Sequence, residues 1–161
     1  MKVAYFDCIA GASGDMLMGA LVDAGLPIAA LEAELAKLHL DDFHVRVRKV
    51  SKNAFGATKI DVEVRDDSPE RYLEDIRVIV ESSDISQRVK ERAMRVFKRI
   101  CEVEGSIHGM AYDEVHLHEV GSVDAIVDVV GVLSALEMLG ISRVVVSPLP
   151  MGRGFVKGVH G

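Results

Sequence analysis

The sequence has few aromatic residues, cysteines and prolines, and these scarcities exclude several classes of protein. Aromatic residues make up 5% of the 161 residues, tryptophan is absent, and 25 acidic residues outnumber 19 basic ones. We therefore expect no nucleic-acid partner, which would need a basic footprint and aromatic stacking platforms. Two cysteines are too few for a disulfide framework or a structural zinc site. Cys8 and Cys101 are predicted to be small buried hydrophobes.

Long hydrophobic runs are missing as well. Hydrophobic residues account for 49% of the chain, but no run approaches the roughly 18 residues that a membrane span requires. Asp7 interrupts the first apolar stretch too early for a secretory signal. We expect a soluble protein without a membrane partner, with the cytoplasm as its default location. Its length suits one domain over residues 1–161 with a substantial core.

The densest group of chemically active side chains lies within thirteen residues near the middle of the second half of the chain. His116 and His118 alternate within a predicted strand, so both imidazoles would project from one face. Ser122 is predicted to cap a helix in which Asp124 and Asp128 are neighbours, because they are four residues apart. Two imidazoles and two carboxylates on facing elements indicate a metal or acid-base site.

The helix after Ser122 is apolar almost all round, so we expect it to be buried. Asp124, Asp128 and Ser134 would form a polar seam on it, where an unpaired carboxylate is costly. One explanation is a cation that neutralises the seam. The other is that Asp124 complements the positive helix start and Asp128 pairs with an arginine.

A second candidate site lies where a predicted buried strand at 2–6 runs through a glycine loop into a helix. A glycine loop lets the backbone approach a ligand, and amides at a helix start attract phosphate. Asp7 and Asp15 flank the loop and are more typical of Mg²⁺ or Mn²⁺ ligands. The alternative is a tight turn in which Ser13 caps the helix. The loop consists of Gly11, Ala12, Ser13 and Gly14.

Hydrophobic periodicity predicts an α/β fold with a central mixed sheet flanked by helices. A helix that begins at 82–84 carries the most basic region, interpreted as a solvated face, with an acidic partner or subunit contact as the alternative. Arg153, Lys157 and His160 lie in a glycine-rich tail and suit anion or metal contacts, or a plain terminal tail. The strands are expected near residues 2–6, 43–50, 58–65, 115–119 and 143–147, the second and third forming an antiparallel pair and the last being buried.

Three ordered motifs resemble the LarC family of nickel insertion proteins. They are Tyr5-Phe6-Asp7-Cys8 with Ala10 to Met16, His116 to Gly121 with Asp124 to Asp128, and Ser147 to Gly152 with His160-Gly161. The resemblance implies a cyclometallase, a nickel chelatase of the lyase class. Such an enzyme inserts Ni²⁺ into pyridinium bisthiocarboxylate mononucleotide to form the nickel-pincer cofactor of lactate racemase, and it hydrolyses CTP with Mn²⁺ or Mg²⁺.

The resemblance also bears on completeness and partners. Family members are longer, and their carboxyl-terminal part resembles a nucleotide-binding half that is absent here. The chain is therefore interpreted as an amino-terminal portion, incomplete for CTP hydrolysis by itself. We expect its partners to be the mononucleotide substrate, the carboxyl-terminal half and, in a homo-oligomer, further copies of the chain.

Three functional hypotheses follow from these residues. In the leading one, His116 and His118 hold Ni²⁺ with help from Glu119, and His160 is a further candidate nickel ligand. The second is a nickel-delivery module without catalysis, and the third is a metal-dependent phosphohydrolase. In the leading hypothesis the same pocket is lined by Asp7, Asp15, Asp124 and Asp128, one of which acts as the base.

Overall fold

The computed structural model describes residues 1–9, 11–40, 43–52, 54–64, 71–117, 121–152 and 154. Helices and strands alternate irregularly along the chain. In order they are β1 (Lys2–Phe6), α1 (Gly14–Asp23), α2 (Ile28–Ala36), β2 (Phe43–Lys52), β3 (Phe55–Val64), α3 (Leu73–Ser82), α4 (Gln87–His108), α5 (Val123–Met138) and β4 (Ile141–Val146). The predicted α/β class is confirmed. No helix in this described part of the chain is both long and apolar enough to cross a bilayer.

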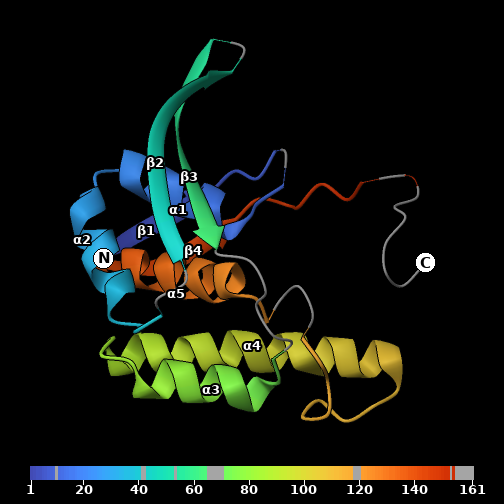
Figure 1. The fold of residues 1–161 in the computed structure, drawn as a ribbon. Helices are drawn as coiled ribbons and strands as arrows, with labels where there is room; N and C mark the ends of the chain where they lie inside the picture. Colours follow the sequence, from blue (N-terminus) through green and yellow to red (C-terminus); the bar gives the residue numbers. More distant parts are fainter. Residues whose placement is uncertain are drawn as a thin grey trace.

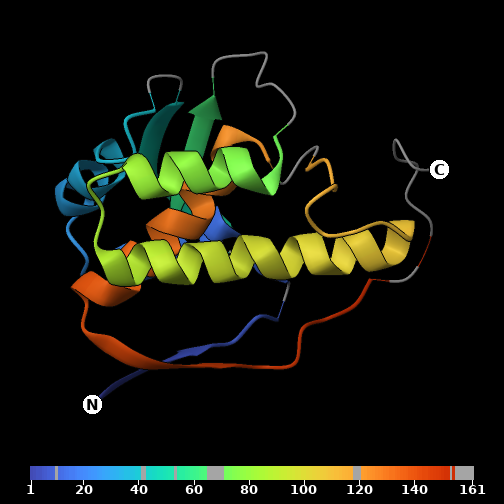
Figure 2. The ribbon, with the colours of Figure 1, turned by 90° about the horizontal axis from the view of Figure 1, so that it is seen from below.

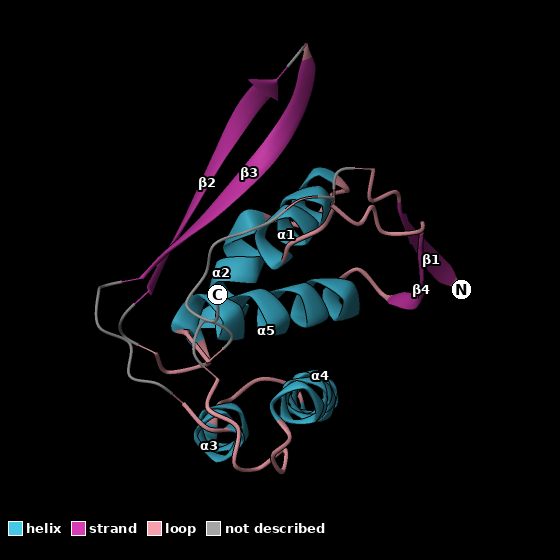
Figure 3. Cartoon of the chain, turned by 90° about the vertical axis from the view of Figure 1, so that its right-hand side faces the viewer, coloured by secondary structure: helices cyan, strands magenta, loops and turns pink. Residues whose placement is uncertain are grey.

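Helix α5 lies at the centre of the molecule, with α1 and α2 on one side and α3 and α4 on the other (Figures 1 and 3). Its side chains meet neighbours in several directions, and Ile126, Val127 and Val130 are fully buried. Burying each such side chain contributes about 1.5–3 kcal/mol. The prediction that this apolar helix is buried is confirmed, and Ser122 stands at its N-cap position.

The strands form two separate two-stranded sheets in the described residues, where the sequence predicted one central sheet. Strands β1 and β4 are parallel, and β2 and β3 form the predicted antiparallel pair. The predicted strand at 115–119 is only an isolated bridge between Leu117 and Arg71 in its described part. The Leu117 N–H donates to the Arg71 carbonyl at 3.0 Å, so this segment pairs with the residues before α3. The centre of the fold is therefore a helix.

The parallel sheet is more exposed than its sequence predicts. Val3 and Val146 are each 49% exposed and Tyr5 is 63% exposed. Parallel strands are normally covered on both faces, but this sheet has two strands and lies at one side of the molecule, where β4 contacts α5 (Figure 2). The prediction of a buried strand at 143–147 is wrong because helices do not enclose this sheet within the described residues.

The β2–β3 hairpin packs one face on α1 and exposes the other. Val45 and Ile60 are buried, while Arg46 pairs with Glu63 at 3.2 Å on the outer face. This is the alternation expected of a half-buried antiparallel sheet. The solvated outer face predicted from the sequence is confirmed.

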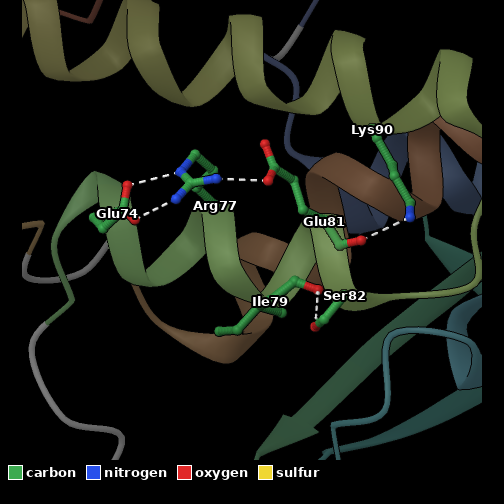
Figure 4. Close-up of polar contacts among 6 residues, drawn as sticks. All are labelled: Glu74, Arg77, Ile79, Glu81, Ser82 and Lys90. Atoms are coloured by element: carbon green, nitrogen blue, oxygen red, sulfur yellow. Dashed lines mark hydrogen bonds and ion pairs between the residues drawn. The ribbon is translucent and has the colours of Figure 1, made fainter.

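Helices α3 and α4 pack side by side and are joined by a short loop. The hydroxyl of Ser86 accepts a hydrogen bond from the Val89 N–H at 3.2 Å, so α4 begins at Gln87, a few residues later than predicted. On α3, Arg77 pairs with Glu74 and Glu81, as Figure 4 shows. The Arg77 guanidinium lowers the pKa of Glu74. Both cysteines are buried, as predicted.

Candidate carboxylate site at the starts of α1 and α5

The candidate site forms where the first turn of α1 meets the second turn of α5. Backbone N–H groups of Gly14 and Asp15 hydrogen-bond the Asp128 carboxyl. A Cβ atom at Gly14 would overlap the Cβ of Asp128, so only glycine permits this approach. The first N–H groups of a helix have no partner within the helix. Here Asp128 of α5 supplies that partner for α1.

Asp128 is an unusual carboxylate in both its pKa and its hydrogen bonding. Burial raises its pKa to about 6, and the negative charges of Asp15 and Asp124 add to the effect against the lowering by the two backbone N–H groups. Its Oδ1 atom is buried and has no hydrogen-bond partner among the described residues. A buried oxygen in this state is costly unless a proton or a cation meets it. Asp128 is therefore suited to accept a proton near neutral pH or to bind a cation.

Asp15 and Asp124 occupy equivalent positions in the first turns of their helices. The Asp15 carboxylate accepts one hydrogen bond from the Ser13 hydroxyl and another from the Met16 N–H, the latter at 2.7 Å. Asp124 repeats this arrangement with Ser122. Each serine stands at the N-cap position, as predicted, but its hydroxyl donates to the aspartate and caps no backbone N–H. The favourable charge at a helix start is a sufficient reason for both aspartates.

The same explanation fails for Asp128. The alternative derived from the sequence was an arginine partner, and no arginine in the described ranges pairs with Asp128. At the start of α1, where the sequence placed a phosphate, the Gly14 and Asp15 amides meet the Asp128 carboxyl, and the phosphate role stays a prediction. A cation agrees better with this charge distribution. Ser134, the third member of the predicted seam, is buried, and its hydroxyl has no partner among the described residues.

Asp7 was predicted to line the same pocket as the other aspartates, and the glycine loop was predicted to contact a ligand. Asp7 is exposed, and no interaction among the described residues joins it to the other three aspartates. Gly11 adopts a φ of 90°, which favours glycine, and its N–H donates to the Cys8 carbonyl at 3.2 Å. Ala12 is exposed. The ligand role of the loop stays a prediction.

His116 is exposed and belongs to a small aromatic contact. Its Nε2 atom lies 2.7 Å from the Tyr72 hydroxyl, in a hydrogen bond, and the two ring centres are 4.2 Å apart. Within the described residues, no three His, Cys, Asp or Glu side chains gather closely enough to hold a metal ion. Five predicted site residues lie outside the described residues, so the predicted nickel ligand set stays a prediction. They are His118, Glu119, Arg153, Lys157 and His160.

Sequence reasoning missed the two residues before α3 that position this segment. Tyr72 contacts His116, and Arg71 donates through Nη1 to the Gly121 carbonyl at 2.9 Å. Arg71 therefore holds the turn that leads into α5. The partners are 44 and 50 positions apart in the chain, so no local spacing indicated these contacts.

The fold and the site define an α/β protein in which a half-buried carboxylate, with two more nearby, is suited to meet a proton or a cation. A family model described as "Nickel insertion protein" matches residues 4–161, and the chain belongs to this family. The family predicted from the sequence motifs is thereby confirmed.

Curated relatives support the same assignment. A "Putative nickel insertion protein" of Desulfotalea psychrophila is 47% identical over 99% of this chain and 41% of its own length. A protein of the same name from Geotalea uraniireducens is 46% identical over 100% of this chain and 42% of its own length. A "Pyridinium-3,5-bisthiocarboxylic acid mononucleotide nickel insertion protein" of Desulfitobacterium hafniense is 45% identical over 100% of this chain and 40% of its own length. The chain thus spans about two fifths of these relatives. No solved structure matches it significantly.

Proposed function

We propose that this chain is the nickel- and substrate-binding part of a protein that inserts nickel into pyridinium-3,5-bisthiocarboxylic acid mononucleotide. Two findings support the proposal. The chain belongs to the nickel insertion family, and a relative 45% identical to it carries that substrate in its name. Asp128, whose buried Oδ1 has no partner among the described residues, supplies a group suited to the chemistry.

Nickel insertion into an aromatic ring needs a base as well as metal ligands. Forming a carbon–nickel bond replaces a ring C–H bond, and the proton that leaves must be accepted. A carboxylate with a pKa of about 6 is ionised at neutral pH and still basic enough to take that proton. We assign this role to Asp128, with the charges of Asp15 and Asp124 helping to keep its pKa raised.

The metal itself is cargo, and we assign its binding to imidazole nitrogens, which suit Ni²⁺. His116 and His118 hold the ion with help from Glu119 and His160, while the thiocarboxylate sulfurs of the substrate supply softer ligands. We assign contacts with the anionic groups of the substrate to Arg153 and Lys157.

Nucleotide hydrolysis and completion of the cofactor involve more than this chain. CTP hydrolysis with Mn²⁺ or Mg²⁺ requires the remaining three fifths of the longer relatives, and the product is the nickel-pincer cofactor of lactate racemase. We also propose that copies of this chain associate as a homo-oligomer.

Isothermal titration with Ni²⁺ tests the metal assignment. We expect His116→Ala combined with His118→Ala to weaken nickel binding at least about tenfold, which corresponds to about 1.4 kcal/mol, because two imidazole ligands are lost. His44→Ala is the matched control, because His44 is an exposed histidine on β2. Unchanged nickel affinity in the double variant would refute the assignment.

A second experiment isolates the base. In a protein completed with the missing segment, Asp128→Asn should abolish nickel insertion while nickel affinity stays within a few fold of the wild type. Loss of insertion and of nickel binding together would show that Asp128 is a ligand, and retained insertion would remove it from the mechanism.

A non-catalytic nickel carrier is the second candidate, favoured by the exposure of His116. The discriminating measurement is turnover of this chain with substrate, Ni²⁺, CTP and Mn²⁺, with and without the remaining segment. Cofactor formation by this chain alone excludes a pure carrier. Phosphate release from nucleotides tests the third hypothesis, a metal-dependent phosphohydrolase, and an inactive completed protein would eliminate it.

A further inference from the structure

An exposed apolar face follows one side of α4. Four apolar side chains there are separated by four, three and four residues, so they form one stripe along the helix. Ile100 is half-buried and the other three are exposed, Ile107 by 70%. The second half of α4 runs past the end of α3, which leaves it uncovered by that helix (Figures 1 and 2). We call Val96, Ile100, Val103 and Ile107 the α4 stripe.

The α4 stripe continues into a groove between α4, α5 and β4 (Figure 3). Val96 and Ile100 line this groove from α4, and Val144 lines it from β4. Strand β4 pairs with β1 on one edge, and no strand in the described ranges pairs with its other edge. Parallel sheets are normally covered on both faces, and free strand edges are normally protected. The groove thus joins an exposed helix face to an unfinished sheet.

Arginines border this apolar face. Arg92, Arg95 and Arg99 line the groove from α4, and Arg143 lines it from β4. Only Arg99 among them forms an ion pair within the described residues, an exposed one with Glu102 at 3.2 Å that contributes little. No carboxylate lines the groove. Gathered positive charges are unfavourable unless a negative group meets them, so the missing partner should be acidic.

The shape of the face indicates a polypeptide partner. From Arg92 to Ile107, α4 rises roughly 22 Å at 1.5 Å per residue, which is longer than a small molecule covers. For this basic region the sequence left open a solvated face and an acidic partner. A solvated face carries polar side chains, whereas here exposed apolar side chains lie between the arginines. Exposed apolar surface rimmed by polar residues is typical of a protein interface.

We propose that this face docks the remaining segment of the nickel insertion protein, meaning the three fifths of the longer relatives that lies outside this chain. The chain covers 41% and 42% of the lengths of two relatives, so in each of them a larger segment is attached to the matching region. Attachment gives that segment a high effective concentration at the face, so contacts of modest strength suffice to hold it there. The proposal rests on family membership and these lengths, and not on the nickel assignment.

A second copy of this chain fits the face less well. In a two-fold dimer the same patch lies on both subunits, so the groove arginines of one copy would approach those of the other. Juxtaposed like charges are costly in an interface. The docked surface therefore belongs to a different segment, which presents apolar side chains edged by aspartate or glutamate. The proposed homo-oligomer uses another surface.

Rates of thiol labelling test whether the remaining segment covers the face. The variants Val103→Cys and Val144→Cys report on the α4 stripe and the groove, and the wild type gives the background because both native cysteines are buried. We expect both variants to react at least about tenfold more slowly in the completed protein than in this chain alone, because labelling then requires undocking. Phe55→Cys is the matched control. Phe55 is 80% exposed at the end of the hairpin, and its variant should react equally in both proteins.

Charge reversal in the completed protein tests the acidic character of the partner. Arg95→Glu combined with Arg143→Glu should return the labelling of the Val103→Cys variant to within about threefold of its rate in this chain alone, since like charges then face each other. Both arginines are exposed, and the urea midpoint checks that the fold is intact. Arg46→Glu, at an exposed arginine on β2, is the control and should leave the protection unchanged.

Three results would overturn the inference. Equal labelling of the Val103→Cys variant in the two proteins means that the remaining segment does not cover the face. Labelling that slows as the concentration of this chain alone is raised assigns the face to a second copy. Protection that survives the charge reversal removes the acidic partner. Nickel titration of the charge-reversed protein should match the wild type, so failure of this proposal is distinguishable from failure of the proposed nickel site.

Discussion

Replacing Asp128 by asparagine should make the protein more stable above pH 6. The pKa of Asp128 is raised from 3.8 to about 6 in the folded state. A carboxyl whose pKa is higher in the folded than in the unfolded state destabilises the folded protein when it is ionised. For Asp128 this destabilisation reaches its full size above about pH 6. Asparagine keeps the shape and can still accept the N–H bonds from the start of α1, but it carries no charge.

The magnitude follows from the size of the shift. The difference between 3.8 and about 6 is about 2 pKa units, and each unit corresponds to about 1.4 kcal/mol, which gives a ceiling of about 3 kcal/mol. Because Asp128 is only half-buried, solvent screens its charge and we expect about 1–2 kcal/mol. Between pH 4 and 6 the unfolded carboxyl is ionised and the folded one is protonated. Folding then takes up a proton, so the wild type loses stability as the pH rises through this window.

Urea denaturation of wild type and Asp128→Asn, with a chelator present and across pH 4 to 8, measures the effect. The free-energy difference between the two proteins should grow by about 1–2 kcal/mol from pH 4 to pH 8. Subtracting the two stabilities removes the contribution of other carboxyls, such as Asp23, which both proteins share. Hydrogen bonds from Lys49 and Thr58 lower the pKa of Asp23 to about 2, so its stabilising effect is lost only below about pH 4. A difference that is constant with pH would refute the raised pKa and the burial argument behind it.

Two further changes test how the site is held together. Gly14→Ala should destabilise the protein by about 1–3 kcal/mol, the usual cost of overpacking, because its Cβ would overlap Asp128. Gly56→Ala is the control, since open space surrounds Gly56, and urea denaturation compares the two. Arg71→Gln should cost about 1 kcal/mol by losing the 2.9 Å hydrogen bond to the Gly121 carbonyl. Faster amide hydrogen exchange at the start of α5 would confirm it, and unchanged exchange would contradict it.

Most of the secondary structure was predictable from the sequence because its signals are local. The alternation of Val45 and Val47 with charged residues predicted the hairpin, and the apolar surface of α5 predicted a buried helix. The errors came from contacts between distant segments. Leu117 lies in a segment with the alternating pattern of a strand, but its described part forms only an isolated bridge with Arg71. Val146 is exposed because its sheet has only two strands in the described residues.

The candidate site shows the same division. The sequence by itself determined which residues bear chemistry, because Asp15 and Asp124 each follow a serine at a helix start and Asp128 lies one turn further on. Only the tertiary structure decided that Asp128 meets the start of α1 at Gly14, which partly buries the carboxylate and raises its pKa. The type and periodicity of a side chain are local properties of the sequence, whereas the burial of Asp128 depends on Gly14, which lies 114 positions earlier in the chain.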